Sequence, residues 1–374
     1  MVRMLKKLFS QPRGRPGGSD PYVAFLADVA EPLEIRSSTA MKTPLASFRL
    51  RTLIPSRQLS DSIRIWVLPL GHVTADPMLA RYGEPVAAVL TKLPSPFVAE
   101  GGARMKALFS WMQEWKRAKR RLIADVSDHY ASTGHPNLVE FQNTLLRHAE
   151  VVVPCEALRE ELRQGASHPV TVIEDPYERE SAASVRVSAS DPVRLCWFGQ
   201  FSGPTLGSVT RALVQLGGHL KGRRAILTIV AGARQLAAIR QFAATMAQTN
   251  PAIELRFTQW SAEATWAAIE ESDFVLLPQD AENPWGRVKS HNRIVETIRC
   301  GRLPLAMPIP SYLELRDYAC VRASLAEAFD WALSNLEEAR RRVMAGQDYI
   351  ETRFSPRVVA EKWSRLLGVP AGEK

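Results

Sequence analysis

A short polar stretch around Ser290 holds the residues with the clearest chemistry. A buried strand is predicted to end at Pro278, a glycine-containing loop follows, and a helix is predicted to begin around Ser290. Ser290 is expected to be the N-cap, which would leave the backbone N–H groups of the first turn free. With Lys289 and Arg293 beside them, these groups are predicted to bind an anion such as a phosphate.

The same helix carries a carboxylate one turn further along. Asn292 and Glu296 stand four residues apart and therefore share one helical face. Glu296 is suited to accept hydrogen bonds from the hydroxyl pair of a ribose. A phosphate site next to a ribose site predicts that this segment binds a nucleotide. An ordinary sheet-packing helix with a surface Glu296 is the alternative interpretation.

Two further loops are candidates for the same site. Gly199 and Gln200 follow a predicted strand, where a glycine lets backbone N–H groups approach a phosphate. Glycine after a strand is also common turn chemistry. Trp260 follows another strand and is placed to stack on a base, although packing in the core is the more frequent role of tryptophan.

The first half of the chain has one candidate of its own. Asp128 and His129 follow the predicted strand Leu122–Val126. A carboxylate and an imidazole at the carboxyl end of a strand are suited to orienting or deprotonating an acceptor hydroxyl, and we predict them as catalytic residues. A turn aspartate beside a surface histidine is the alternative.

Positive charge is concentrated in two segments. The net charge is +9, from 48 basic and 39 acidic residues. Met1–Pro16 carries five basic residues and no acidic one, and Ala103–Leu122 carries seven against Glu114 alone. If Trp111 or Trp115 faces outward, the second segment is predicted to attach to an anionic membrane surface. Packing of both tryptophans on a sheet is the alternative. Neither segment shows a nucleic-acid recognition motif, so no nucleic-acid partner is expected.

The composition excludes several other classes. Hydrophobic residues make up 46% of the chain, but no apolar run is long enough to span a bilayer and no signal peptide is evident. The four cysteines stand singly, so neither a zinc site nor a disulfide framework is expected. No metal and no cofactor are predicted, and a cytoplasmic location is expected.

Short apolar runs alternate with helical stretches in two series, which predicts an α/β protein with two Rossmann-like lobes. The expected organisation is a basic flexible tail (1–20), a first lobe (21–176), a linker (177–192), a second lobe (193–350) and a C-terminal helix that returns to the first lobe (351–374).

The helix with Glu296, followed by Gly301, a strand and Pro308-Ile309-Pro310, resembles the donor-site region of family-four (group one) glycosyltransferases of GT-B fold. In that family two glutamates stand eight positions apart, and Glu296 matches the second, which binds the nucleotide ribose. Val288 stands where the family has the first glutamate, which contacts the donor sugar. The resemblance covers roughly Val193–Leu367. It implies two Rossmann-like lobes facing across a cleft.

The resemblance further implies transfer of a sugar from a nucleotide-diphosphate donor to an acceptor hydroxyl of a glycan, a lipid-linked molecule or a small molecule. Retention of the anomeric configuration is implied, with no metal, since Lys289, Arg293 and helix N–H groups would stabilise the leaving diphosphate. Peripheral attachment to the inner membrane face is the expected location. Two alternatives remain: a catalytically idle partner or scaffold of the same fold, which Val288 favours, and a nucleotide-sugar epimerase.

Overall fold

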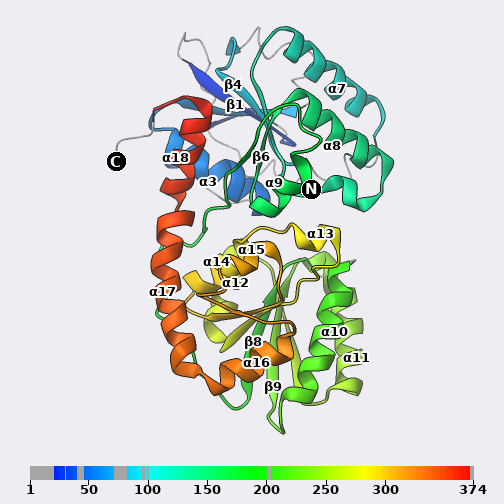
Figure 1. Cartoon of the computed structure of the whole chain (residues 1–374), viewed down its shortest axis with the longest axis vertical. Helices are drawn as coiled ribbons and strands as arrows, with labels where there is room; N and C mark the ends of the chain where they lie inside the picture. The colour runs from blue at the N-terminus through cyan, green and yellow to red at the C-terminus, as the bar shows by residue number, and fades with distance from the viewer. Residues whose placement is uncertain are drawn as a thin grey trace. The chain divides into compact units, whose positions relative to one another are not determined.

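The chain folds into two compact units in the computed structural model, which describes residues 21–29, 31–39, 46–70, 82–93, 98, 101–200 and 204–370 (Figure 1). Unit 1 comprises residues 1–178, 288–290 and 354–374, and unit 2 comprises residues 179–287 and 291–353. The chain thus enters unit 1 three times. The predicted basic tail and residues 201–203 of the predicted glycine loop lie outside the described residues.

Unit 1 is built on a seven-stranded sheet in which only the edge strand β2 runs antiparallel. Its central strands are rich in branched and small apolar residues and are buried on both faces, as expected of a parallel sheet covered by helices. In spatial order the strands are β2 (Leu33–Ile35), β3 (Arg64–Pro69), β1 (Tyr22–Ala27), β4 (Ala87–Leu90), β5 (Leu122–Asp125), β6 (Glu150–Val153) and β7 (Val170–Val172).

Helices cover both faces of this sheet. Successive residues of β1 enter two different cores, because side chains alternate across a strand. One core is formed with α7 (Gly102–Arg117), α8 (Pro136–His148) and α9 (Glu156–Leu162). The other is formed with α3 (Ile54–Leu59) and α18 (Pro356–Leu367), which pack against each other. The remaining short elements are α2 (Ala46–Phe48), the π-helix η1 (Arg49–Leu53) and the 3-10 helix η2 (Tyr130–Thr133).

Unit 2 has a six-stranded parallel sheet. In spatial order its strands are β10 (Ile253–Gln259), β9 (Ala225–Ala231), β8 (Val193–Phe198), β11 (Phe274–Leu277), β12 (Leu303–Ala306) and β13 (Cys320–Val321). Chain order therefore reverses between β8 and β11. Open parallel sheets bind ligands at such a switch point, beyond the carboxyl ends of the strands.

The helices of unit 2 are likewise divided between two faces. One core joins β8 and β9 to α10 (Pro204–His219), α11 (Leu236–Thr249), α16 (Leu325–Ser334) and α17 (Leu336–Phe354). The helices α12 (Ala262–Glu271) and α14 (Asn292–Arg299) contact the strands β8, β9, β11 and β12. Three short elements complete the unit, namely η3 (Ala233–Gln235), α13 (Pro284–Arg287) and α15 (Pro310–Leu313).

The predicted linker 177–192 is not a free connection. From Arg179 onward it belongs to unit 2, where two buried arginines hold its backbone. Arg302 Nη1 donates to the carbonyl of Ser184 at 3.3 Å, and Arg299 Nε donates to the carbonyl of Arg179 at 3.2 Å. Its polar composition suggested a linker because the segment lacks apolar periodicity. The side chains that bind its carbonyl groups come from more than 100 residues away in the sequence.

Candidate functional site

Arg293 lies at the carboxyl edge of the unit 2 sheet, directly against Gly199. Its guanidinium carbon is 5.7 Å from the centroid of the Trp197 ring. A Cβ atom at position 199 would lie 2.6 Å from Arg293 Nη2, and the φ of Gly199 is +147°. The φ favours glycine at this position, whereas the close contact is with the end of a flexible side chain that could move aside. The guanidinium of Arg293 therefore lies directly beside Gly199. The sequence predicted only that a phosphate could approach the backbone at this glycine.

Arg293 carries an unsatisfied donor. Among the described residues, its Nη1 atom is buried and has no hydrogen-bond partner. The nearby Tyr312 is buried, and burial raises its pKa, while Arg293 and a hydrogen bond with Gln279 partly offset that effect. A buried guanidinium N–H without an acceptor is costly, so the site favours a ligand that supplies one.

The predicted N-cap is wrong. The helix α14 begins at Asn292 with His291 as its N-cap, and His291 makes no side-chain capping bond. The Ser290 hydroxyl instead donates to Asp175 Oδ2 at 2.6 Å in unit 1. Serine is a preferred N-cap in general, but here a buried carboxylate competes for its hydroxyl. Asn292, at the first turn of α14, is half-buried.

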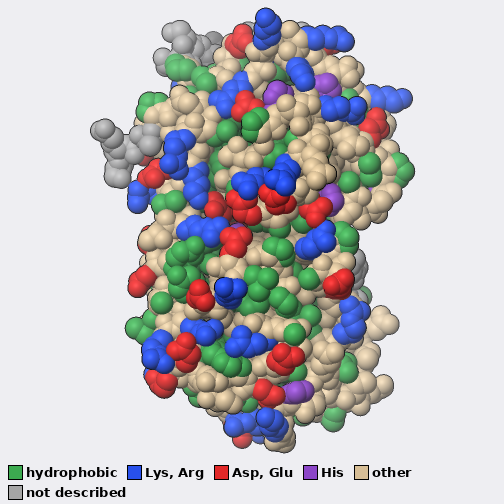
Figure 2. All heavy atoms as spheres, in the orientation of Figure 1, with side chains coloured by type: hydrophobic (Ala, Val, Ile, Leu, Met, Phe, Trp, Pro, Cys, Tyr) green, Lys and Arg blue, Asp and Glu red, His purple; other side chains and the backbone are tan. Residues whose placement is uncertain are grey.

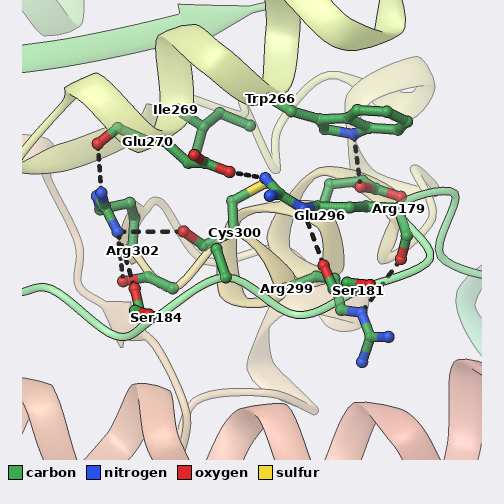
Figure 3. A network of polar contacts seen from close by, with 12 residues as sticks. Arg179, Ser181, Ser184, Trp266, Ile269, Glu270, Glu296, Arg299, Cys300 and Arg302 are labelled. Atoms are coloured by element: carbon green, nitrogen blue, oxygen red, sulfur yellow. Dashed lines mark hydrogen bonds and ion pairs between the residues drawn. The ribbon is translucent and has the colours of Figure 1, made fainter.

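Glu296 lies one turn further along α14 and is 6% exposed. Its Oε2 atom accepts a hydrogen bond from the indole Nε1 of Trp266 on α12 at 3.3 Å. Figure 3 shows the two side chains pointing toward each other from the two helices. Glu296 is therefore not the surface glutamate of the alternative interpretation.

The two remaining donor-site candidates lie at the ends of neighbouring strands. Gln200 follows β8 and is exposed. Trp260 follows β10 and is half-buried, and its backbone N–H donates to the carbonyl of Ala231 at 2.9 Å. Because β8, β9 and β10 are adjacent and parallel, both residues stand at the same edge of the sheet as Gly199.

Asp128 lies in unit 1 between two lysines. Lys289 Nζ is 2.7 Å from Oδ1 of Asp128, and Lys92, which the sequence did not single out, pairs with Oδ2. Burial alone would raise the pKa of Asp128, but the two ammonium groups hold it below its ordinary value. Asp128 is thus a fixed carboxylate and a weak base. His129, beside it, is half-buried and precedes η2.

A second ionic cluster lies at the same edge of unit 1. Arg51 of the π-helix η1 donates through Nε to Asp125 at 2.6 Å and through Nη1 to Asp175 at 2.9 Å. All three side chains are buried. Asp175 also accepts the bond from Ser290, and Cys155 Sγ donates to the carbonyl of Val288 at 3.3 Å. These contacts place the segment 288–290 in unit 1.

The tryptophans of the basic helix α7 do not face outward, as anchoring in a membrane surface would require. Trp111 and Trp115 are 8% and 2% exposed, and their rings contact each other in a tilted arrangement with centroids 4.8 Å apart. Neither is therefore available as an interfacial anchor, because both pack in the unit 1 core. The basic side chains are exposed: Arg104, Lys106, Lys116, Arg117 and Lys119. On the face of the molecule in Figure 2, basic side chains stand among acidic and uncharged ones.

None of the described helices is both long and apolar enough to span a bilayer. No group of three or more histidine, cysteine, aspartate or glutamate side chains suited to hold a metal ion was found in the described ranges.

Comparison with known proteins shows the fold. No protein-family model matches the chain, and no curated protein does so either. HepE of Anabaena, in complex with UDP and glucose, is 15% identical with a TM-score of 0.62, over 93% of this chain and 99% of HepE. Trehalose-6-phosphate synthase of Burkholderia multivorans is 8% identical with a TM-score of 0.59, over 93% and 98%.

A glycosyltransferase of Rickettsia africae is 12% identical with a TM-score of 0.51, over 94% of this chain and 98% of that protein. Together with the two parallel sheets, these similarities define a GT-B glycosyltransferase fold of two Rossmann-like units. The predicted fold class is confirmed, whereas membership of family four remains a proposal.

Proposed function

We propose that this protein is a glycosyltransferase that moves a sugar from a nucleoside diphosphate donor to an acceptor hydroxyl. The single observation that carries the proposal is Arg293, with its unsatisfied buried N–H at the carboxyl edge of the unit 2 sheet. A diphosphate supplies acceptor oxygens and the opposite charge. The GT-B fold, and the UDP bound by HepE, make a nucleotide sugar the ligand that best fits this edge.

The donor residues that we propose lie in unit 2. Arg293 and the backbone beside Gly199 and Gln200 bind the diphosphate, Glu296 binds the ribose, and Trp260 stacks on the base. Asn292, in the first turn of α14, adds hydrogen bonds near the phosphates. Lys289 and Ser290 are bound to Asp128 and Asp175 in unit 1, so their role at the donor is a prediction that a separate variant must test.

Acceptor binding is proposed for unit 1, at Asp128 and His129. An ionised Asp128 with a lowered pKa is suited to accept a hydrogen bond from a hydroxyl rather than to remove its proton. This agrees with a retaining, metal-independent transfer, in which the departing diphosphate lies next to the acceptor and takes its proton. The acceptor is proposed to be a glycan or a lipid-linked sugar, and the location to be cytoplasmic.

Calorimetric titration of the purified protein with UDP, GDP, ADP and CDP tests the donor proposal. We expect one diphosphate to bind at least about tenfold more tightly than its nucleoside, because the charge-assisted bonds to Arg293 are lost without the phosphates. Glu296→Ala should weaken that diphosphate by about 1.5–3 kcal/mol. Binding of none of the four, or equal affinity for nucleoside and diphosphate, would contradict the proposal.

We propose that the exposed basic side chains of α7 attach the protein to an anionic membrane by electrostatic attraction, without an inserted tryptophan. Each exposed basic residue of α7 contributes on the order of 1 kcal/mol near such a surface. Co-sedimentation with vesicles containing anionic lipid should occur at low salt and be lost at high salt. An Arg104→Glu, Lys106→Glu, Arg117→Glu variant should not co-sediment. Equal binding to neutral vesicles, or none at low salt, would refute the attachment.

A catalytically idle partner of the same fold is the second candidate, and one observation favours it. Val288, at the position of the family's sugar-binding glutamate, is 2% exposed and packs in the unit 1 core. Hydrolysis of UDP-sugars without acceptor is a sensitive assay of activity. A protein that binds UDP tightly but shows no turnover of any common UDP-sugar, with or without glycan acceptors, would be an idle partner.

A further inference from the structure

The indole of Trp266 supports the ribose-binding carboxylate of Glu296. Glu296 is 6% exposed and accepts from Trp266 Nε1 at 3.3 Å. A carboxylate that leaves water needs hydrogen-bond donors, and an indole has a single N–H to give. A carboxylate offers about four acceptor positions. The bond to Trp266 therefore restricts the orientation of the Glu296 carboxylate.

The two helices that carry this pair are tied together. The buried guanidinium of Arg302 donates to the carbonyl groups of Cys300 and Gly301 at 3.2 and 3.1 Å, at the end of α14. The same guanidinium donates to the carbonyl of Ser272, just after α12, at 2.9 Å, and to the carbonyl of Glu270. Figure 3 shows Arg302 between the two segments.

The start of α12 is also fixed. The Ser261 hydroxyl accepts from the backbone N–H of Ala264 at 3.0 Å and so caps the helix. At the other end, the side chain of Glu270 pairs with Arg179. Since α12 is held at both ends and joined to α14 through Arg302, the indole N–H has a defined position relative to the Glu296 carboxylate.

We propose that Trp266 is a positioning residue that sets the preference of the donor site for ribonucleotides over deoxyribonucleotides. It acts through Glu296 and touches no substrate atom itself. The inference rests on the proposed function, because it requires Glu296 to accept hydrogen bonds from the ribose hydroxyls. Without the indole N–H, the carboxylate loses one of the contacts that orient it, and its bonds to the hydroxyls weaken. Contacts to the phosphates and the base stay unchanged.

Calorimetry with UDP, 2′-deoxy-UDP and 3′-deoxy-UDP tests this on the full chain. The readout is the ratio of each deoxy Kd to the UDP Kd. In the wild-type protein, at least one ratio should be about tenfold or more, as expected of a bond to a charged group. Trp266→Phe keeps an aromatic ring but removes the N–H. It should lower that ratio by about two- to tenfold and leave the affinity for the deoxy analogue within about twofold.

Trp331→Phe is the matched control. Trp331 is another half-buried tryptophan of unit 2, and its ring packs against the guanidinium groups of Arg342 and Arg322 at 4.7 and 5.3 Å. The same exchange there should leave the ratio unchanged. Thermal unfolding of both variants checks that each is folded. Glu296→Gln in the Trp266→Phe background should have less effect on the ratio than in the wild-type protein.

The outcomes separate the inference from the proposed function. No binding of UDP by the wild-type protein contradicts the UDP donor and the inference with it. Binding without preference for UDP over both deoxy analogues removes Glu296 from the ribose and refutes the inference, whereas the nucleoside diphosphate donor stands. Preference for UDP that Trp266→Phe leaves intact, or a variant that weakens UDP and its deoxy analogues equally, overturns the inference alone.

Discussion

The carboxyl edges of the two sheets differ in how their cationic side chains are paired. In unit 1, the cations Arg51, Lys92 and Lys289 are bound to the carboxylates Asp125, Asp128 and Asp175. In unit 2, Arg293 lies against the ring of Trp197 and retains a buried N–H without an acceptor among the described residues.

This difference indicates where an anion binds. The charges at the edge of unit 1 neutralise one another, so an added anion would have to displace a carboxylate already in place. At the edge of unit 2, a diphosphate would instead satisfy a donor for which the described residues supply no acceptor. A buried donor without a partner favours a ligand that supplies an acceptor. Arg51 Nη2 of unit 1 also lacks a hydrogen-bond partner among the described residues, but it lies 2.6 Å from the Asp125 carboxylate. Three tests of this contrast follow, in order of expected effect.

Arg51→Met should have the largest effect, and on stability. It leaves Asp125 and Asp175 buried without their cation, which typically costs about 3–5 kcal/mol. Burial already raises the pKa of Asp125 despite Arg51. In the variant this pKa rises further above its unfolded value, so stability is lost as pH increases through it. Denaturant unfolding should therefore show a smaller loss at pH 5 than at pH 7.

Arg64→Met is the control for Arg51→Met. Arg64 pairs with Glu34 at 3.2 Å on the same unit, but its side chain is 31% exposed. A partly exposed pair is worth about 1 kcal/mol or less. If both variants lose the same amount, the buried cluster of unit 1 is not the stabilising element that the comparison requires.

Arg293→Met and Lys289→Met form the second test, because the sequence assigned both cations to the diphosphate. Arg293→Met should weaken UDP by about 1.5–3 kcal/mol and change stability by less than about 1 kcal/mol. Lys289→Met should leave the affinity for UDP nearly unchanged and should lower stability by about 1–3 kcal/mol. The loss is limited because Lys92 still pairs with Asp128. Calorimetry and denaturant unfolding give the two quantities. If Lys289→Met weakens UDP as much as Arg293→Met, the contrast between the two edges fails.

The sequence predicts the order of elements well and the pairing of side chains poorly. The strands β8, β9 and β11 are apolar runs bounded by glycine or polar residues, which is a local signal. The strand predicted to end at Pro278 is β11, which ends at Leu277. The short edge strands β2 and β13 were missed, since two or three residues carry no periodicity. At the candidate site, Arg293 and Glu296 were identified from their places on one helix.

Their partners could not be identified in the same way. Lys92 is 36 residues before Asp128, and Trp266 is 30 residues before Glu296. No spacing rule links such residues, because the fold alone brings them together. The carboxylates Asp125 and Asp175 did leave a signal, since Asp125 ends the buried strand β5 and Asp175 comes shortly after the half-buried strand β7. The Ser290 error has the same origin, because a local capping preference lost to a long-range bond with Asp175.

The smallest effect on stability is expected at Glu314 of unit 2. Like Asp128 in unit 1, Glu314 lies between two basic side chains, but it is less buried. Its Oε2 lies 2.7 Å from Arg353 Nη2 and 3.1 Å from His291 Nε2. Burial alone would raise the pKa of Glu314, but His291 and Arg353 lower it from 4.5 to about 2. A lowered pKa means that the stabilisation is complete above the unfolded value of 4.5 and is lost as pH falls from there toward 2.

Glu314→Gln should therefore cost about 1–2 kcal/mol at pH 7, after allowance for partial solvent screening. The difference from the wild-type protein should shrink at pH 4.5 and again at pH 3.5. Glu337→Gln is the control, since Glu337 is 81% exposed in its pair with Arg340, and it should change stability by less than about 0.5 kcal/mol at every pH. Denaturant unfolding at the three pH values gives all these differences.

Two outcomes would contradict this prediction. If the loss of stability in Glu314→Gln stays constant from pH 7 to 3.5, packing rather than charge accounts for the contribution of this carboxylate. If the loss is as large as that of Arg51→Met, the degree of burial does not determine how much each ionic cluster contributes to stability.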